Sequence, residues 1–446
     1  MYTKKLIKSC YLRGGTLAII VALALGVSLA AEPVTFEFWH AMAGTNGDVT
    51  QKICDDFNAS QSDYRVVPVF KGSYADTMNA GIAAFRAGQA PAILQVYEVG
   101  TATMMAAKGA VKPVYQLMAE NNAKFDPKIY IPAITGYYST ADGKMVAMPF
   151  NSSTAVMYYN KDAFKKAGLD PNKPPVTWPE LFADAKKIKE AGYAGGFTTS
   201  WISWIQLENF SAWHNVPFGT LSNGFGGLAA RLTFNGPLQV QHFTNMYNLS
   251  KEGVFIYGGR ENKADPVFTS GQVGIYFASI GGYGTIKSAS KFDFGVARLP
   301  YYPEVKDAPQ NSIIGGAALW VLTGKSAAVY KGVADFFSYL SKPEVQAYFH
   351  EKTGYLPITK AAYDLAKSQG FYKANPGPEV AILQLLNKTP TANSMGIRFG
   401  YMPQIREYED QVWEDILAGK ISPKDGLDKM VDLGNAKLAE FERLNK

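Results

Sequence analysis

The chain of 446 residues has few of the residue types that build common catalytic and redox sites. It contains 2 cysteines and 4 histidines, and no histidine pair has a metal-ligand spacing such as H-E-x-x-H. The G-x-S-x-G elbow of serine hydrolases is also missing. We therefore expect a protein without a metal, a cofactor or catalytic residues. Acid pairs for glycoside cleavage stay open, because the separation of two carboxylates depends on the fold.

Long apolar runs are missing outside the first thirty residues. There, four basic residues precede an apolar run over 17–27, and the small residues Ser28 and Ala30 fit a cleavage site. The run is too short to span a bilayer. It predicts a signal peptide over 1–30, cleaved near Ala30/Ala31, and a mature protein outside the cytoplasm. With Cys10 removed, Cys54 stands alone, and we expect it to be a small buried apolar residue without a disulfide.

The mature chain also lacks a strong charge. Lys and Arg number 44 and Asp and Glu 38, but the signal holds four basic residues and no acidic ones, so the mature balance is 40 against 38. This balance gives no electrostatic footprint for nucleic acid. The roughly 415 remaining residues exceed the 250 to 300 that one core supports, so two lobes are expected.

Strand-like and helix-like segments alternate along the chain, which predicts an α/β fold with mostly parallel sheets flanked by helices. Val34 to Trp39 and Arg65 to Phe70 read as strands, and Thr177 begins a helix with a capping box. No linker separates the lobes, so the chain is expected to cross between them more than once. The predicted lobes are 31–150 with 317–350 and 151–312 with 356–446, joined by hinge segments near 150–156, 313–317 and 350–357.

The segment Ala90 to Gly100 reads as a buried strand that ends on Tyr97 and Glu98. In open α/β sheets, ligands bind beyond the carboxyl ends of the strands, so these two residues lie where a ligand would be held. A solvated turn carboxylate is the structural alternative. Backbone N–H groups of the cluster 281–284 could face an anion, although such glycine clusters are more often plain turns. Trp201 and Trp204 could form one apolar wall, or simply belong to the core of a helix.

Several of these segments together resemble a known family. Trp39-His40, Ala90 to Gly100, Pro149 to Thr154, Trp201 to Phe210 and Thr353 to Ile358 are similar to extracytoplasmic solute-binding proteins of ABC importers. The segments Gly81 to Arg86, Trp204 to Trp213, 308–311 and Met402 to Arg406 resemble, more narrowly, the members that bind sn-glycerol-3-phosphate. The likeness extends over nearly all of the mature chain.

The resemblance implies a two-lobed periplasmic-binding-protein fold with a multi-segment hinge. It implies a monomer in the periplasm that captures sn-glycerol-3-phosphate without chemical change, with glycerophosphocholine and other glycerophosphodiesters as further candidate ligands. The partner would be the permease subunits of an ABC importer in the inner membrane. The ligand-binding positions carried over are Tyr74, Glu98, Ser153, Trp201, Trp204, Ser279, Gly316, Tyr355 and Arg406.

These positions suggest a division of roles. Arg406 can offer a bidentate fork to phosphate, while Glu98, repelled by that anion, accepts hydrogen bonds from glycerol hydroxyls at the opposite end. Around Ser279 the chain departs from the family pattern, with Ile280 and Gly282 where further serines would be expected. Two alternatives stay open: an oligosaccharide-binding protein of the same fold, and an exported glycerophosphodiesterase.

Overall fold

The structure is a computed structural model that describes residues 32–446. The expected signal peptide over 1–30 and its cleavage near Ala30/Ala31 lie outside the described residues. Within 32–446, no helix combines the length and the hydrophobicity that crossing a bilayer requires. Residues 33–446 form one unit built around two separate sheets.

The first sheet has the strand order β2-β1-β3-β10-β4, with β5 also paired to β10. All five residues of β3 are buried, as the apolar sequence of this strand predicts for a sheet covered on both faces. On β1, Phe36 and Phe38 are buried on one face. The strands are β1 (Val34–His40), β2 (Tyr64–Phe70), β3 (Ile93–Tyr97), β4 (Val111–Lys112), β5 (Met148–Ser153) and β10 (Gly315–Leu322).

The second sheet has the order β7-β8-β6-β9 and comprises β6 (Ala155–Asn160), β7 (Phe197–Thr199), β8 (Ile275–Ser279) and β9 (Phe294–Ala297). The chain passes from the first sheet to the second at Thr154, between β5 and β6, and returns before β10. The Thr154 hydroxyl lies 2.7 Å from Ser312 Oγ and 2.9 Å from the carbonyl of Ile313, so it ties the two crossings together. The predicted lobe boundaries stay a prediction.

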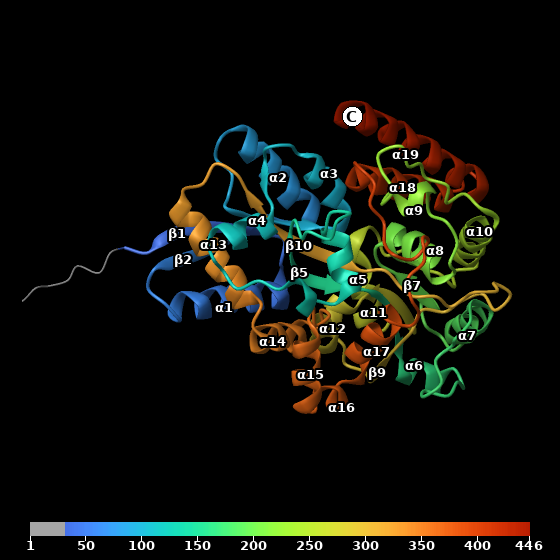
Figure 1. Ribbon diagram of the computed structural model, residues 1–446. Helices are drawn as coiled ribbons and strands as arrows, with labels where there is room; N and C mark the ends of the chain where they lie inside the picture. The colour runs from blue at the N-terminus through green and yellow to red at the C-terminus, as the bar shows by residue number, and fades with distance from the viewer. Residues whose placement is uncertain (1–31) are drawn as a thin grey trace, which may run out of the picture. The chain divides into compact units, whose positions relative to one another are not determined.

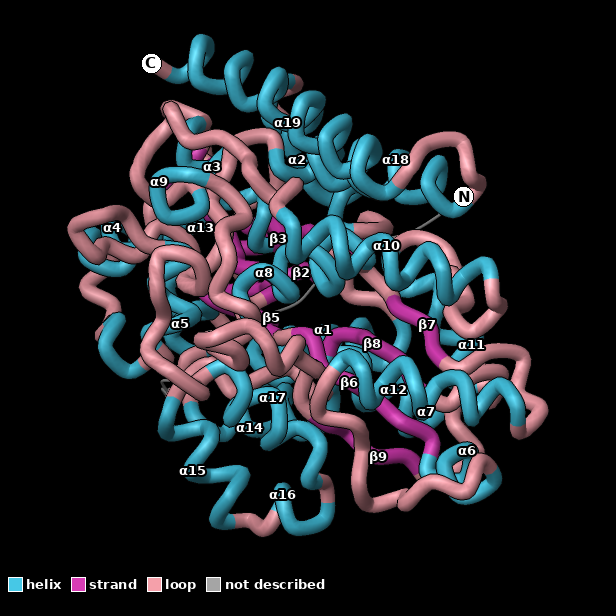
Figure 2. Tube along the Cα trace, turned by 90° about the vertical axis from the view of Figure 1, so that its right-hand side faces the viewer, coloured by secondary structure: helices cyan, strands magenta, loops and turns pink. Residues whose placement is uncertain are grey.

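Helices cover both sheets (Figures 1 and 2). Contacts link α1 to β2, α2 to β3 and α13 to β1, while α18 and α19 pack against each other and α10. The helices are α1 (Gly44–Ala59), α2 (Tyr74–Arg86), α3 (Thr101–Ala106), α4 (Val114–Glu120), α5 (Pro132–Thr135), α6 (Lys161–Lys166), α7 (Trp178–Glu190), α8 (Phe210–Trp213), α9 (Thr220–Asn223), α10 (Pro237–Lys251), α11 (Asp265–Thr269), α12 (Tyr283–Ala289), α13 (Ala327–Leu340), α14 (Pro343–Thr353), α15 (Lys360–Ser368), α16 (Phe371–Ala374), α17 (Pro376–Leu385), α18 (Met402–Leu417) and α19 (Pro423–Asn445).

The expectation of mostly parallel sheets is wrong in detail. β1 runs parallel to β2 and β3, and β7 parallel to β8. The pairs β10 with β3, β4 and β5, and β6 with β8 and β9, are antiparallel. Strands that carry the chain from one sheet to the other are not part of repeated right-handed βαβ units, so their direction is not set by the parallel rule.

Two local predictions are confirmed. Thr177 and Glu180 form a capping box at the start of α7, and the helix ends before Gly192, which has a φ of +94°. Cys54 is a buried free cysteine that is 1 % exposed. Burial raises the pKa of the Cys54 thiol well above its usual range, so this residue behaves as a small apolar side chain.

Gly316 on β10 gives a test of how closely β5 and β10 approach each other within the first sheet. Its φ is +93°, and an added Cβ would lie 1.8 Å from the carbonyl oxygen of Asn151. Gly324 has a similar φ of +84°, but no described residue other than its chain neighbours lies within 4 Å of its Cβ position. Gly324→Ala should cost about 1 kcal/mol of backbone strain. Gly316→Ala adds a backbone clash and should cost at least about 2 kcal/mol more in urea unfolding. Equal losses in the two variants would contradict the close approach of β5 and β10.

Candidate functional site

A cavity of about 490 Å³ lies at the ends of strands from both sheets. All nine residues singled out from the sequence line this cavity, although they are spread from position 74 to position 406. The fold thus brings them together, while their role as ligand contacts stays a prediction. Other lining residues include Asn46, Tyr97, Glu261, Asn262 and Asp265.

The strand-end location expected for Glu98 is confirmed. Glu98 follows the last residue of β3 and begins a short 3-10 helix, Glu98–Gly100. Ser153 and Ser279 are the last residues of β5 and β8, and Gly316 is the second residue of β10. Because β10 runs antiparallel to β3 and β5, its first residues lie at the same sheet edge as the ends of these two strands. Rigid strand ends therefore position four of the nine residues.

A hydrogen-bonded chain of side chains sets the direction of the tyrosine hydroxyls. Gln95 donates to Asn151 Oδ1 over 2.8 Å, and Asn151 Nδ2 donates to the Tyr74 hydroxyl over 2.7 Å. The Tyr74 ring stacks on Tyr97 at 5.4 Å, and its hydroxyl lies 3.4 Å from that of Tyr355. Since Asn151 already donates to Tyr74, the hydroxyl hydrogen of Tyr74 remains available to Tyr355 or to a ligand.

The two tryptophans lie on backbone segments of different conformation, and not on one regular helix. Trp201 has a φ of +42°, and its Nε1 donates to Asn262 Oδ1 over 2.7 Å. Trp204 lies on a π-helix, Ser203–Asn209, and is 4 % exposed. Its ring packs against the backbone of Gly315, where an added Cβ would come within 2.4 Å of the ring. Such π-helical turns are rare and frequently lie at functional sites, and sequence periodicity does not reveal them.

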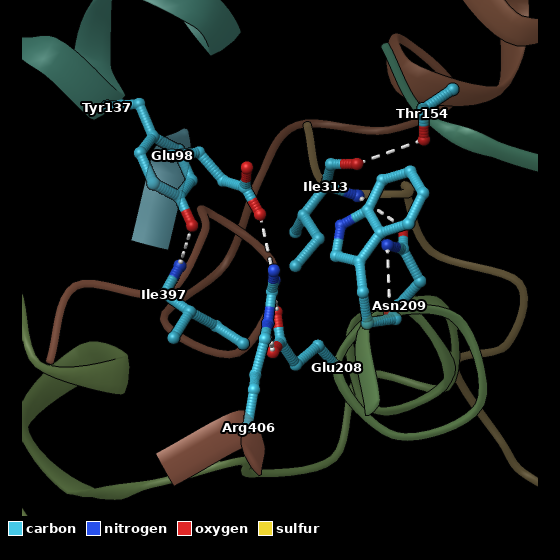
Figure 3. Close-up of polar contacts among 9 residues, drawn as sticks. Glu98, Tyr137, Thr154, Glu208, Asn209, Ile313, Ile397 and Arg406 are labelled. Carbon is cyan, nitrogen blue, oxygen red and sulfur yellow. Dashed lines mark hydrogen bonds and ion pairs between the residues drawn. The ribbon is translucent and has the colours of Figure 1, made fainter. Parts of the chain in front are cut away.

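Arg406 lies at the centre of a buried ion-pair cluster (Figure 3). Its Nε and Nη2 donate to the two carboxylate oxygens of Glu208, each over 2.7 Å, and Nη2 also donates to Glu98 Oε1 over 2.8 Å. Arg406, Glu98 and Glu208 are 6 %, 3 % and 1 % exposed. The expectation that Arg406 and Glu98 occupy opposite ends of the ligand site is therefore wrong. A guanidinium buried this deeply requires counter-charges, and the two glutamates provide them.

The same contacts correct the expected bidentate fork to phosphate. Nε and Nη2 are occupied by carboxylates, whereas Nη1 makes no hydrogen bond to any residue of 32–446. Arg406 lines the cavity, so Nη1 is the nitrogen left for a ligand. Arg406 can thus offer the two N–H groups of one nitrogen, and its charge is already balanced within the protein.

Burial controls protonation in this cluster. It raises the pKa of Glu98 to about 6, against the opposing effect of Arg406. Burial alone would lower the pKa of Arg406, but the charges of Glu208 and Glu98 raise it well above its usual value. Burial, followed by the charge of Glu208, also raises the pKa of Glu409 well above its usual range, and neither of its carboxylate oxygens has a partner in the described part. The neutral form of Glu409 is thus favoured.

Other parts of the cavity lining offer hydroxyl and amide groups. Ser279 Oγ accepts a hydrogen bond from the Gly281 N–H over 3.0 Å, so that N–H is not free for an anion, while the Ser279 hydroxyl hydrogen can still be donated. The buried Ser153 hydroxyl makes no hydrogen bond to the described residues. Asn46 on α1 donates to the carbonyl of Gly281 over 3.2 Å, which connects elements of the two sheets across the cavity.

Sequence reasoning missed Glu208, Glu261 and Asp265. Glu208 had a visible signal, since it is the one charged residue in the otherwise apolar or neutral segment Trp204 to Phe210. A carboxylate in such a segment is buried only when it has a partner. Glu261 and Asp265 carried no signal, because acidic residues in a loop are normally solvated.

Asp410 on α18 gives a pH-dependent test of how burial shifts the pKa of a carboxyl group near Arg406. Burial raises its pKa to about 7, against the charges of Arg260 and Arg406, and its Oδ1 has no partner in the described part. Because the folded-state pKa exceeds the unfolded one, the wild type should lose stability as pH rises from about 4 to about 7. Asp410→Asn should remove this loss. The free energy of unfolding of this variant should exceed that of the wild type by up to about 4 kcal/mol at pH 8 and by little at pH 4. Urea unfolding at both pH values measures the difference, and a gain independent of pH would contradict the assignment.

Comparisons with known proteins agree with this architecture. A family model described as bacterial extracellular solute-binding protein matches residues 52–378. The sn-glycerol-3-phosphate-binding periplasmic protein UgpB of Yersinia pseudotuberculosis is 51 % identical over 431 residues, which is 96 % of this chain and 98 % of the relative.

Solved structures show the same fold. UgpB from Mycobacterium tuberculosis in complex with glycerophosphocholine has a TM-score of 0.75 at 21 % identity, covering 91 % of this chain and 98 % of that one. Maltose-bound MalE3 of T. maritima has a TM-score of 0.73 at 19 % identity, covering 92 % and 100 %. The expected two-lobed α/β fold is thereby confirmed. Together, these matches show that the chain belongs to the family of bacterial extracellular solute-binding proteins.

Proposed function

We propose that this protein captures sn-glycerol-3-phosphate and glycerophosphodiesters in the cavity and delivers them unchanged to the permease of an ABC importer. The signal over 1–30 would direct it to the periplasm, with cleavage near Ala30/Ala31, and it would act as a monomer. The observation that carries the proposal is the convergence of all nine sequence-predicted residues on one cavity. The likeness to sn-glycerol-3-phosphate-binding relatives over 96 % of the chain supports the choice of ligand.

The cavity has the donors that a phosphate ester needs. Hydroxyl groups of Ser153, Ser279 and Tyr355 and the backbone N–H of Gly316 line it, together with Arg406. Phosphate oxygens are strong acceptors, and several convergent donors on rigid elements hold them at low entropic cost. Neutral donors matter here because the charge of Arg406 is shared with Glu98 and Glu208.

Glu98 and the aromatic side chains suit the glycerol part of the ligand. A carboxylate accepts hydrogen bonds from hydroxyl groups, and Glu98 keeps Arg406 beside it as a counter-charge. Tyr74, Trp201 and Trp204 supply apolar surface against the carbon skeleton. Excluding water beneath these rings strengthens the polar contacts.

The mechanism is closure around the ligand. Glu98 and Gly316 belong to the first sheet, whereas Ser279 and the Trp204 π-helix lie with the second sheet. A ligand that contacts both groups binds more tightly when the walls are close, so it shifts the population toward the closed state. The permease would recognise that state. No group on the chain need react with the ligand.

Oligosaccharide binding is the alternative within this fold, since tryptophan and carboxylate side chains also suit sugars. A competition panel of neutral sugars against glycerol-3-phosphate separates the two. An exported glycerophosphodiesterase would instead release glycerol-3-phosphate and an alcohol from the diester, which phosphorus NMR detects. We expect neither displacement by sugars nor turnover.

Calorimetric titration with glycerol-3-phosphate tests the proposal. We expect micromolar or tighter binding by the wild type, because several charge-assisted hydrogen bonds converge. Tyr355→Phe removes one hydroxyl without opening a cavity and should weaken binding by about tenfold or more. Tyr115→Phe, at a half-buried tyrosine outside the cavity, is the matched control. Arg406→Ala is a poorer choice, since it would leave Glu98 and Glu208 buried without their counter-charge and destabilise the fold.

Absent or millimolar binding by a folded wild type would contradict the proposed function. Equal affinities of wild type and Tyr355→Phe would instead show that the ligand lies away from Tyr355.

A further inference from the structure

The charged residues that line the cavity are unequal in sign. Among the described residues, the lining set contains three carboxylates, on Glu98, Glu261 and Asp265, and one guanidinium, on Arg406, with no lysine or histidine. Arg406 is already paired with Glu98 and with Glu208, which does not line the cavity. Glu261 and Asp265 therefore line the cavity without a positively charged residue of the lining left to pair with them.

These two carboxylates belong to the same wall as Trp201. Glu261 begins a 3-10 helix, Glu261–Ala264, and Asp265 begins α11 directly after it. The Trp201 N–H donates to the carbonyl of Glu261 over 3.1 Å, and Trp201 Nε1 donates to Asn262 Oδ1 over 2.7 Å. One short segment thus holds Trp201 through its backbone and through its indole, and the same segment carries both carboxylates.

Neither carboxylate has a structural partner of opposite charge. Within 32–446, no ion pair includes Glu261 or Asp265, although Asp265 accepts a hydrogen bond from the Tyr276 hydroxyl. Burial raises the pKa of both carboxyls, and the opposing effects of Lys263 on Glu261 and of the Tyr276 hydroxyl on Asp265 do not cancel it. By contrast, the neighbouring Arg260 is paired with Glu414 and so does not neutralise them.

We propose that Glu261, Asp265 and the Trp201 ring form a subsite for a cationic head group, so that zwitterionic glycerophosphodiesters are preferred ligands. This inference rests on the proposed function and names the preferred ligand class within it. An alkylammonium group loses little hydration, gains cation–π attraction from the indole and balances the two carboxylates. Its phosphodiester carries one negative charge, which the neutral donors and Arg406 Nη1 accommodate more easily than the dianion of a monoester.

Calorimetric titration of three ligands distinguishes the head groups: glycerophosphocholine, the neutral-headed glycerophosphoglycerol, and glycerol-3-phosphate. For the wild type, the choline diester should bind at least about tenfold more tightly than the neutral diester. Glu261→Gln removes charge at nearly constant volume and, unlike Asp265→Asn, breaks no hydrogen bond recorded in the described part. Glu304→Gln, at an exposed carboxylate outside the cavity, is the matched control.

Glu261→Gln should reduce the preference for choline over the neutral head at least about fivefold, and Glu261→Gln with Asp265→Asn should nearly abolish it. Glycerol-3-phosphate should bind these variants more tightly, because less negative charge opposes its dianion. A preference unchanged by either substitution, or an equal loss for all three ligands, would overturn the subsite. If the folded wild type bound none of the three, the proposed function itself would fail.

Discussion

The ion-pair cluster of Arg406 with Glu208 and Glu98 is the constraint on which the rest of the site depends. It joins three elements that are distant in sequence: α18, the Trp204 π-helix and the end of β3. Each of these charges would be costly to bury alone, and the close geometry makes the three acceptable together. By fixing α18 against the π-helix, the cluster also fixes where Trp204 and Glu98 stand in the cavity. The positions of these site residues therefore depend on the pairing of buried charges as well as on apolar packing.

This arrangement changes how the site would recognise an anion. A free arginine would attract any phosphate, whereas a guanidinium paired with two carboxylates contributes one donor nitrogen and no net positive charge. Recognition then depends on hydroxyl and backbone N–H groups held at strand ends, such as Ser153 and Gly316. Donors of this kind select a ligand by its shape and its hydrogen-bond pattern. Glu261 and Asp265, in the segment that holds Trp201, add a preference for a cationic head group on the phosphate.

Local sequence patterns predicted the parts of the structure that depend on neighbours along the chain. The buried strand β3 followed by Glu98 and the capping box at Thr177 both follow from a few adjacent residues. The apolar character of Cys54 follows from its being the one cysteine left after the expected signal is removed. The resemblance to a known family added which distant residues share one cavity. Neither source could give the strand directions around β10, because periodicity reports which face is buried and not how strands pair.

Long-range electrostatics could not be predicted in the same way. Glu208 stood out as a charge in an apolar segment, but nothing in its neighbourhood identified Arg406, almost 200 positions later, as its partner. The π-helix was equally invisible, since Trp201 and Trp204 at a spacing of three fit an ordinary helix. On α10, the polar residues Gln239 and His242 are buried with Phe243, whereas the more apolar Val240 and Tyr247 are only partly buried. These polar residues find partners in Ser211 and Gln206, which tertiary structure alone supplies.

The most direct measurement is a crystal structure of the protein grown with glycerol-3-phosphate. The account predicts a phosphate oxygen within about 3 Å of Arg406 Nη1, further phosphate contacts to the serine and tyrosine hydroxyls, and an intact pair between Arg406 and Glu208. Phosphate bound away from Arg406, or a guanidinium that has left Glu208 to grip phosphate with two nitrogens, would contradict it.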